Sequence, residues 1–153
     1  NGSIPVQHDW AGRNVSMNKS GFIDLLNEDL ELEYRSIVQY VQHIASVKGA
    51  QWQSNLDELA VHLRQELDHA LILARQIDFL GGVPSTRVPD AERKEDPRAA
   101  LEQDLALEEG QLRRYRERVE QANELGLPDL AETIAPLLSQ TQEHARDLRA
   151  ALG

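Results

Sequence analysis

The sequence predicts an all-α protein, a four-helix bundle with one long crossover between helices two and three. Good helix formers such as Leu, Ala, Glu, Gln and Arg are plentiful, whereas aromatic residues make up 5% of the chain, too few for the core of a β-sandwich or barrel. Apolar residues also recur every three to four positions in four long stretches. A chain of 153 residues is long enough for one domain of this kind.

The first half of the chain contains an arm and two predicted helices. Residues 1–19 mix Gly, Pro, Asn and Ser without periodicity, so we expect them to form an extended N-terminal arm. Ser20 is the expected N-cap of helix one, whose apolar pattern stops at Gly49. The pattern of helix two follows and ends at Gly81-Gly82, a common C-terminal stop.

The second half begins with the crossover. Residues 83–95 carry two prolines and a cluster of charges without an apolar face. Asp96, followed by proline, is the expected N-cap of helix three, which Gly126 closes. Pro136 lies inside helix four and is expected to kink or re-initiate it. The bundle domain therefore spans residues 20–153.

Charge and cysteine content exclude several function classes. The chain has 26 acidic and 16 basic residues, a formal net charge of −10, which disfavours nucleic acid and anionic membranes as partners. Cysteine is absent, so any metal must be held by nitrogen and oxygen atoms. The sequence shows neither a membrane span nor a signal peptide, so we expect a cytoplasmic protein.

Glutamate and histidine residues stand in the middle of the four predicted apolar faces. On helix two, Glu66 and His69 are three residues apart, a spacing that lets them ligate one metal or place a bridging carboxylate between two. A single pair of this kind is usually solvated surface, and a histidine on an apolar stripe is more often structural. Four helices that each carry such a group favour a metal site, because buried carboxylates are costly without a cation. The candidate ligands are Glu33, Glu66, His69, Glu108 and His144.

Five motifs resemble, in the same order and with nearly the same spacing, the helix motifs of bacterioferritins, which belong to the ferritin-like di-iron superfamily. They are Glu33–Tyr40 (EYRSIVQY), Glu66–Ala70 (ELDHA), Phe79–Gly82 with Pro84, Leu105–Glu108 (LALE) and Glu143-His144. The resemblance covers about residues 20–150. It implies a ferritin-like four-helix bundle with two irons per subunit.

The resemblance also implies a role for each candidate ligand. On this resemblance, Glu33 and His69 would be the terminal ligands of the first iron, and Glu66 would bridge both irons. Glu108 and His144 would be the corresponding terminal ligands of the second iron. The same five residues would then be catalytic in a ferroxidase that oxidises Fe²⁺ with oxygen or peroxide, for iron storage and detoxification.

Three departures from the bacterioferritin pattern narrow these expectations. Thr141 replaces a second bridging glutamate, which leaves the second iron site in question, with Glu143 or Asp147 as substitutes. Leu67 stands where the family has its haem-binding methionine, so we expect no haem. Too few residues follow His144 for the fifth helix of twenty-four-subunit ferritins.

Without that helix the chain has the dimensions of the dodecameric ferritins that protect DNA. We therefore expect a homo-oligomer, either a dodecameric cage or a dimer. The arms of those ferritins are rich in lysine, whereas residues 1–20 hold only Arg13 and Lys19 as basic residues. Nucleic acid is accordingly not an expected partner.

Smaller expectations concern other polar residues. We expect His62 to be an exposed helix residue, with an auxiliary iron ligand as the alternative. His8 and Asp9 form a candidate peripheral metal pair. Tyr40 is either a core tyrosine with a satisfied hydroxyl, a hydrogen-bond partner of a metal carboxylate or a redox-active neighbour. Four arginines are expected on a solvated or intersubunit face: Arg113, Arg114, Arg116 and Arg118.

Two alternative functions remain open. One is a rubrerythrin-like di-iron oxidase or peroxidase that acts as a dimer without storage. The other is a non-catalytic metal-binding or structural bundle whose site has decayed at Thr141 to one metal or none. The ligand types suit Fe, Mn or Zn, and the sequence does not choose among them.

Overall fold

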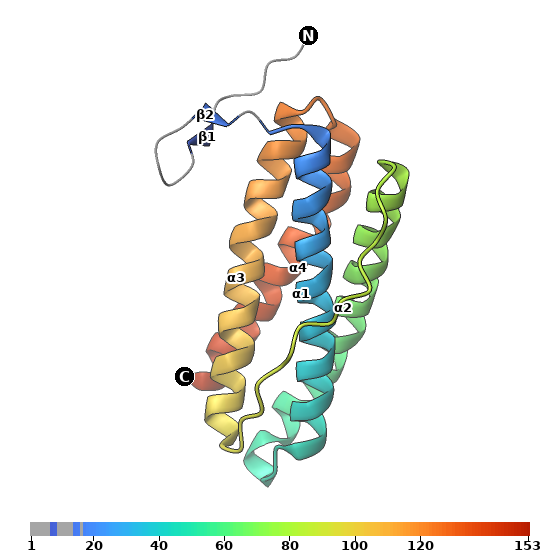
Figure 1. Cartoon of the computed structure of the whole chain (residues 1–153). Coiled ribbons are helices and arrows are strands. Elements are labelled where there is room, and N and C mark those ends of the chain that lie inside the picture. Colours follow the sequence, from blue (N-terminus) through green and yellow to red (C-terminus); the bar gives the residue numbers. More distant parts are fainter. Residues whose placement is uncertain (1–6, 9–13, 16) are drawn as a thin grey trace.

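Four long helices form the bundle in a computed structural model that describes residues 7–8, 14–15 and 17–153. The helices are α1 (Lys19–Ser46), α2 (Gln53–Phe79), α3 (Pro97–Glu124) and α4 (Pro128–Leu152). Helices α1 and α2 run antiparallel, α3 and α4 do likewise, and the segment between α2 and α3 returns along the length of the bundle (Figure 1). The predicted all-α four-helix bundle with one crossover is confirmed.

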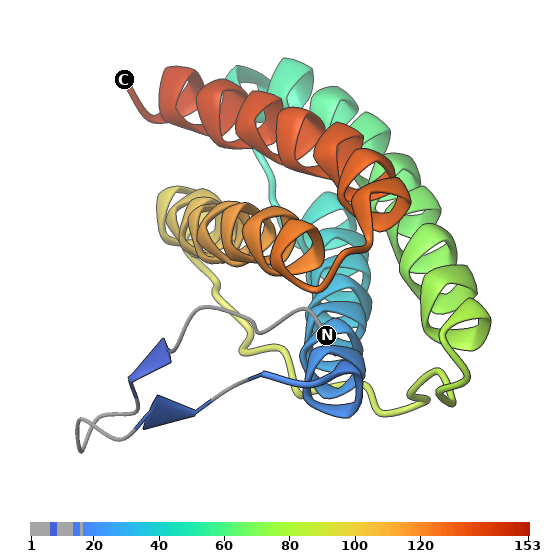
Figure 2. The same cartoon turned by 90° about the horizontal axis from the view of Figure 1, so that it is seen from above.

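The four helices form a ring in cross-section. Helix α1 contacts α2 and α3, and α4 contacts the same two helices from the other side, as the view from above shows (Figure 2). Each helix therefore turns one face towards a common interior. Within the part of the chain that the structure describes, no helix is both long and apolar enough to cross a membrane.

The described part of the chain before α1 contains two strands of two residues each. Strand β1 (Gln7–His8) pairs antiparallel with β2 (Asn14–Val15), whereas Asp9, half of the suggested peripheral pair, lies outside the described residues. Helix α1 begins one residue before the expected cap Ser20. Asn18 caps it instead, because its extended backbone lets the side chain accept a hydrogen bond from the Gly21 N–H at 2.8 Å.

The helix ends expected after α2 and α3, and the cap before α3, are confirmed. After α2, Gly81 has a φ of +87°, and the Gly82 N–H donates to the Ile77 carbonyl at 2.9 Å, which satisfies a terminal carbonyl. Asp96 caps α3 through a hydrogen bond from Ala99 N at 2.8 Å. Gly126, with a φ of +73°, ends that helix.

Pro136 does not re-initiate α4, which runs unbroken from Pro128 to Leu152. Proline removes one helical N–H and therefore leaves the carbonyl four residues earlier, at Glu132, without its donor. Both residues lie on the exposed side of the helix, where that carbonyl can accept a hydrogen bond from solvent. The helix thus tolerates a residue that usually breaks it.

The crossover is fastened to α1 by hydrogen bonds. The Asn27 side chain donates to the Val83 carbonyl at 3.0 Å and accepts from Ser85 N at 2.7 Å. The Tyr34 hydroxyl donates to the Ser85 carbonyl at 3.0 Å. These bonds hold the start of the crossover against the bundle.

Two apolar clusters fill the interior and leave a polar layer between them. The larger cluster includes Phe22, Leu26, Leu30, Leu73, Ile77, Leu130 and Ile134. The smaller cluster is Tyr40, Leu59, Leu101 and Leu148. Because Glu33 and Glu66 follow the first cluster along α1 and precede it along α2, the polar layer is enclosed by apolar packing on both sides.

Candidate metal centre

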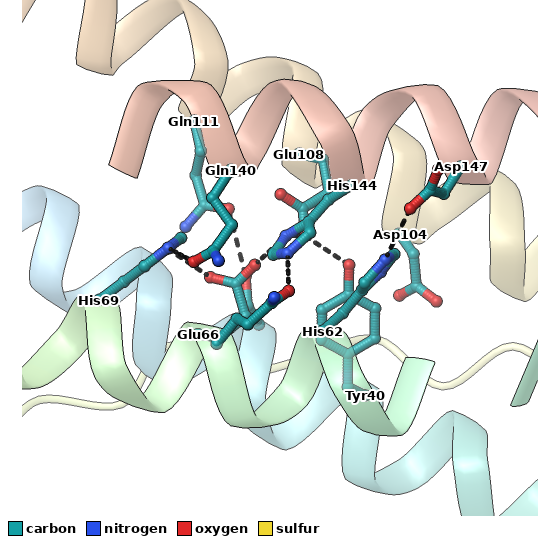
Figure 3. Close-up of polar contacts among 12 residues, drawn as sticks. Tyr40, His62, Glu66, His69, Asp104, Glu108, Gln111, Gln140, His144 and Asp147 are labelled. Atoms are coloured by element: carbon teal, nitrogen blue, oxygen red, sulfur yellow. Dashed lines mark hydrogen bonds and ion pairs between the residues drawn. The ribbon is translucent and has the colours of Figure 1, made fainter. Parts of the chain in front are cut away.

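All five residues expected as ligands lie in this polar layer, and each is at most 1% exposed. They form two groups of three, whose ligand atoms lie within 4.8 Å of one another. We call Glu33, Glu66 and His69 the first triad, and Glu66, Glu108 and His144 the second triad. Glu66 belongs to both, and Figure 3 shows it between the two histidines.

The first triad joins α1 and α2. The Nδ1 atom of His69 lies 3.6 Å from Oε1 of Glu33 and 3.4 Å from Oε2 of Glu66. Its Nε2 lies 2.7 Å from Oε1 of Gln140 on α4. Because an amide oxygen only accepts, Nε2 carries the hydrogen, and this bond orients Nδ1 towards the two carboxylates.

The second triad repeats this arrangement between α2, α3 and α4. The Nδ1 atom of His144 lies 2.9 Å from Oε1 of Glu66 and 3.3 Å from Oε1 of Glu108. Its Nε2 donates to Oε1 of Gln65 on α2 at 2.6 Å. Each histidine is therefore oriented by a glutamine from the opposite helix.

Two buried tyrosines orient the remaining carboxylates. The Tyr115 hydroxyl on α3 donates to Glu33 on α1, and the Tyr40 hydroxyl on α1 donates to Glu108 on α3. Tyr40 is thus a core tyrosine that binds a candidate ligand. The equivalent role of Tyr115 was not predicted, although a signal exists, because each tyrosine follows the glutamate of its own helix by seven residues.

Burial and mutual repulsion shift the protonation of these groups. Burial raises the pKa of Glu33 well above its ordinary value, and the Glu66 charge raises it further. Burial opposes protonation of His69, but Glu33 and Glu66 together raise its pKa to about 11. Glu108 and Glu66 likewise outweigh burial and raise the pKa of His144 to about 9.

Several atoms of the polar layer have no hydrogen-bond partner among the described residues. They are Oε2 of Glu33, Glu66 and Glu108, Nδ1 of His69 and Oγ1 of Thr141. Unpaired buried carboxylate oxygens are costly unless a cation compensates them. The donor set of oxygen and imidazole nitrogen therefore fits a divalent metal, and the shared Glu66 offers one oxygen to each triad.

The residue that departs from the resemblance, Thr141, is also buried in α4 at 1% exposure. Neither of the two suggested substitutes joins the triads, because Glu143 is exposed and Asp147 turns towards His62. Each triad is therefore completed without a carboxylate from α4.

Two sequence expectations about surface residues were wrong. His62 is 3% exposed because its ring stacks on His144, with ring centroids 4.1 Å apart. Arg118 is 1% exposed and pairs with the buried Asp29, its Nε lying 2.8 Å from Oδ2. Arg114 lies 2.5 Å from the same carboxylate, whereas Arg113 and Arg116 are exposed, as expected.

Comparison with known proteins identifies the family and the fold. The profile of the ferritin-like domain family matches residues 23–153, while no significant match was found among curated proteins. A ferritin-like diiron-carboxylate protein from Bacillus anthracis is 32% identical, with a TM-score of 0.86, over 91% of this chain and 100% of that chain.

Two further solved structures are similar. The dodecameric thioferritin of Bacteroides fragilis, a bacterioferritin-related protein, is 27% identical over 89% of this chain and 86% of that one, with a TM-score of 0.77. The bacterioferritin of Rhodobacter capsulatus is 25% identical over 87% and 84%, with a TM-score of 0.76. The family match over most of the chain and the 32% identity together establish that the chain belongs to the ferritin-like domain family.

Proposed function

We propose that this chain binds two Fe²⁺ ions per subunit, one in each triad, and oxidises them for iron storage and detoxification. The observation that carries this proposal is the position of Glu66, whose two oxygens face different histidines. Oε2 lies 3.4 Å from His69 Nδ1, and Oε1 lies 2.9 Å from His144 Nδ1. A carboxylate in this position can bridge two metal ions.

The charges of the centre support two divalent ions. The triads hold three carboxylates in a volume sealed from water, and two Fe²⁺ ions would more than neutralise them. A metal at these nitrogen atoms would also displace the protons that the raised pKa values of His69 and His144 favour. Iron is the metal proposed because the similar Bacillus anthracis protein is a diiron-carboxylate protein.

The reaction takes one electron from each Fe²⁺. With peroxide as oxidant, two Fe²⁺ and one H₂O₂ give two Fe³⁺ and two hydroxide ions; with oxygen, two Fe²⁺, one O₂ and two protons give two Fe³⁺ and H₂O₂. The chain supplies the geometry: Tyr115 and Tyr40 hold the terminal carboxylates, and the two apolar clusters exclude bulk water.

Exposed apolar residues support a homo-oligomer, either a dodecameric cage or a dimer. On α1 and α2 these residues are Val38, Val41, Val61, Leu67 and Leu71, each about half exposed. Apolar residues of this kind on two neighbouring helices favour burial against a second copy of the chain. Leu67, where a haem-binding methionine would stand, is 60% exposed and offers no ligand, so the proposed protein is haem-free.

Anaerobic titration with Fe²⁺, followed by oxygen or peroxide, tests the proposal. Wild type should bind two Fe²⁺ per chain in the triads and oxidise both. Glu66→Gln should weaken the binding of both ions, whereas Glu33→Gln should weaken the binding of one, because only Glu66 belongs to both triads. Glu143→Gln, which removes an exposed carboxylate of α4, is the matched control and should behave as wild type.

One result would overturn the proposal, and a second measurement distinguishes it from the alternative functions. Wild-type Fe²⁺ binding and oxidation in Glu66→Gln would show that the triads are not the site. A particle mass from light scattering then separates the alternatives: two irons in a cage support storage, two in a dimer support a rubrerythrin-like oxidase, and one or none support a non-catalytic bundle.

A further inference from the structure

A third group of possible ligands lies outside the two triads. Glu58 and His62 on α2 and Asp147 on α4 place one oxygen or nitrogen atom each within 4.8 Å of one another. They line a pocket of about 360 Å³ between these helices. Glu58 is exposed, Asp147 is partly exposed and His62 is buried, so the group reaches from solvent into the bundle.

The hydrogen bonding of the buried His62 is incomplete. Its Nε2 lies 3.4 Å from Oδ2 of Asp147, a long contact, and its Nδ1 has no partner at all among the described residues. The side chain is nevertheless 4% exposed. Figure 3 shows it on α2 with its ring directed at Asp147. A buried imidazole next to two carboxylates is a typical donor set for a divalent cation.

The third group is in contact with the second triad. The ring of His62 stacks on that of His144 at a centroid distance of 4.1 Å and an angle of 25°. The same pocket is also lined by His144 and by Gln65, which accepts its Nε2 hydrogen. An ion held at the third group is therefore separated from the second triad by one pair of stacked imidazoles.

We propose that Glu58, His62 and Asp147 form an outer site for a divalent cation, from which ions pass to the second triad. Binding at the outer site stands on its own geometry, while the transfer of ions rests on the proposed dinuclear function. Glu58 meets the hydrated ion first because it is exposed. His62 and Asp147 then replace water ligands beside the buried centre, so that the ion does not lose its whole hydration shell in one step.

Titration with Co²⁺, whose visible absorbance reports nitrogen and oxygen ligation, tests the outer site without oxidation. Wild type should bind three Co²⁺ per chain, one for each group. Asp147→Asn and Glu58→Gln, which keep side-chain volume, should each lose or weaken one ion by about tenfold or more. Both should also slow the loading of the inner ions in stopped-flow absorbance. Glu143→Gln, in the same pocket but outside the group, should bind and load as wild type.

The outcomes separate the two proposals. If Asp147→Asn and Glu58→Gln bind three Co²⁺ and load them at the wild-type rate, the outer site does not exist. If they lose one ion but load the inner sites normally, binding stands and the transfer role is wrong. In Glu66→Gln the outer ion should remain; full wild-type binding in that variant would overturn the inner centre and leave the outer site standing.

Discussion

Thr141 occupies the position on α4 that corresponds to the position of Glu66 on α2. Each precedes an inward-facing histidine by three residues, and each follows a glutamine whose side chain reaches the histidine of the opposite helix. The helix pair α1 and α2 therefore supplies one half of the centre, and the pair α3 and α4 supplies the corresponding half. The two halves differ at this position, where one half has a carboxylate and the other has an unpaired hydroxyl.

Restoring the carboxylate with Thr141→Glu should strengthen metal binding. The new side chain would face the same interior and add a second bridge, so the weaker of the two inner ions should bind more tightly and Fe²⁺ oxidation should be faster than in wild type. Without metal, the extra buried charge should lower the free energy of unfolding by about 3 kcal/mol. Anaerobic titration and urea unfolding, with and without metal, measure both effects.

The control for this change is Thr141→Val, which keeps the volume and shape of the side chain without a carboxylate. It should bind metal as wild type does, and it should be no less stable, since the hydroxyl that it removes has no partner. Loss of a metal ion in Thr141→Glu would mean that the threonine is required for the site.

The helix stripes were sufficient to predict that the five candidate ligands face the interior, but not what surrounds them. Glu66 and His69 could be placed on an interior face because periodicity reports which residues share one side of a helix. His62 lies on the same stripe, yet its burial depends on His144 of another helix. Arg118 was misplaced for the same reason, since its partner Asp29 stands 89 positions earlier in the chain. A single sequence carries no signal for such pairings.

The two tyrosines should act on separate halves of the centre. Tyr115→Phe removes the hydroxyl that donates to Glu33, and Tyr40→Phe removes the one that donates to Glu108. Each loss frees a terminal carboxylate to rotate, so each variant should weaken one of the two inner Co²⁺ ions by about 10- to 100-fold and leave the other unchanged. Competition titration against a chelator measures the two affinities.

Tyr34→Phe is the matched control for both variants. The Tyr34 hydroxyl donates to the Ser85 carbonyl in the crossover and does not reach the triads. Metal binding should therefore stay at the wild-type level. Equal weakening of both ions by either Tyr115→Phe or Tyr40→Phe would contradict the assignment of one tyrosine to each triad.

The metal-free protein should lose stability as the pH rises. The pKa of His144 is about 9 in the folded chain, against an ordinary value of 6.5, so its contribution is fully present below pH 6.5 and disappears as the pH rises through 9. The loss is on the order of 3 kcal/mol. His69, with a pKa of about 11 in the folded chain against 6.5 ordinarily, acts in the same direction over the same interval and on to about pH 11. Urea unfolding in chelator at pH 6.5 and 9.5 measures the change.

With metal bound, the stability of the protein should rise with pH instead of falling, because the ions bind neutral histidine and compete with its proton. At pH 7, binding should release protons, which calorimetry in buffers of different ionisation enthalpy detects. The loss of stability between pH 6.5 and 9.5 should be about halved in metal-free His144→Gln, because His69 still contributes over the same interval. A wild-type protein that becomes more stable with rising pH in chelator would contradict the proposed protonation of the centre.

The buried pair of Asp29 and Arg118 should matter for stability and not for metal. Asp29→Asn leaves the Arg118 guanidinium, which is 1% exposed, without its buried counterion, and should lower the free energy of unfolding by about 3 to 5 kcal/mol. Glu28→Gln, which removes only an exposed partner of Arg114, should cost about 1 kcal/mol or less. Urea unfolding at pH 7 compares the two variants. Co²⁺ binding should be the same in both variants, because neither residue belongs to a triad. Equal stabilities of the two variants would show that the buried pair contributes no more than a surface ion pair.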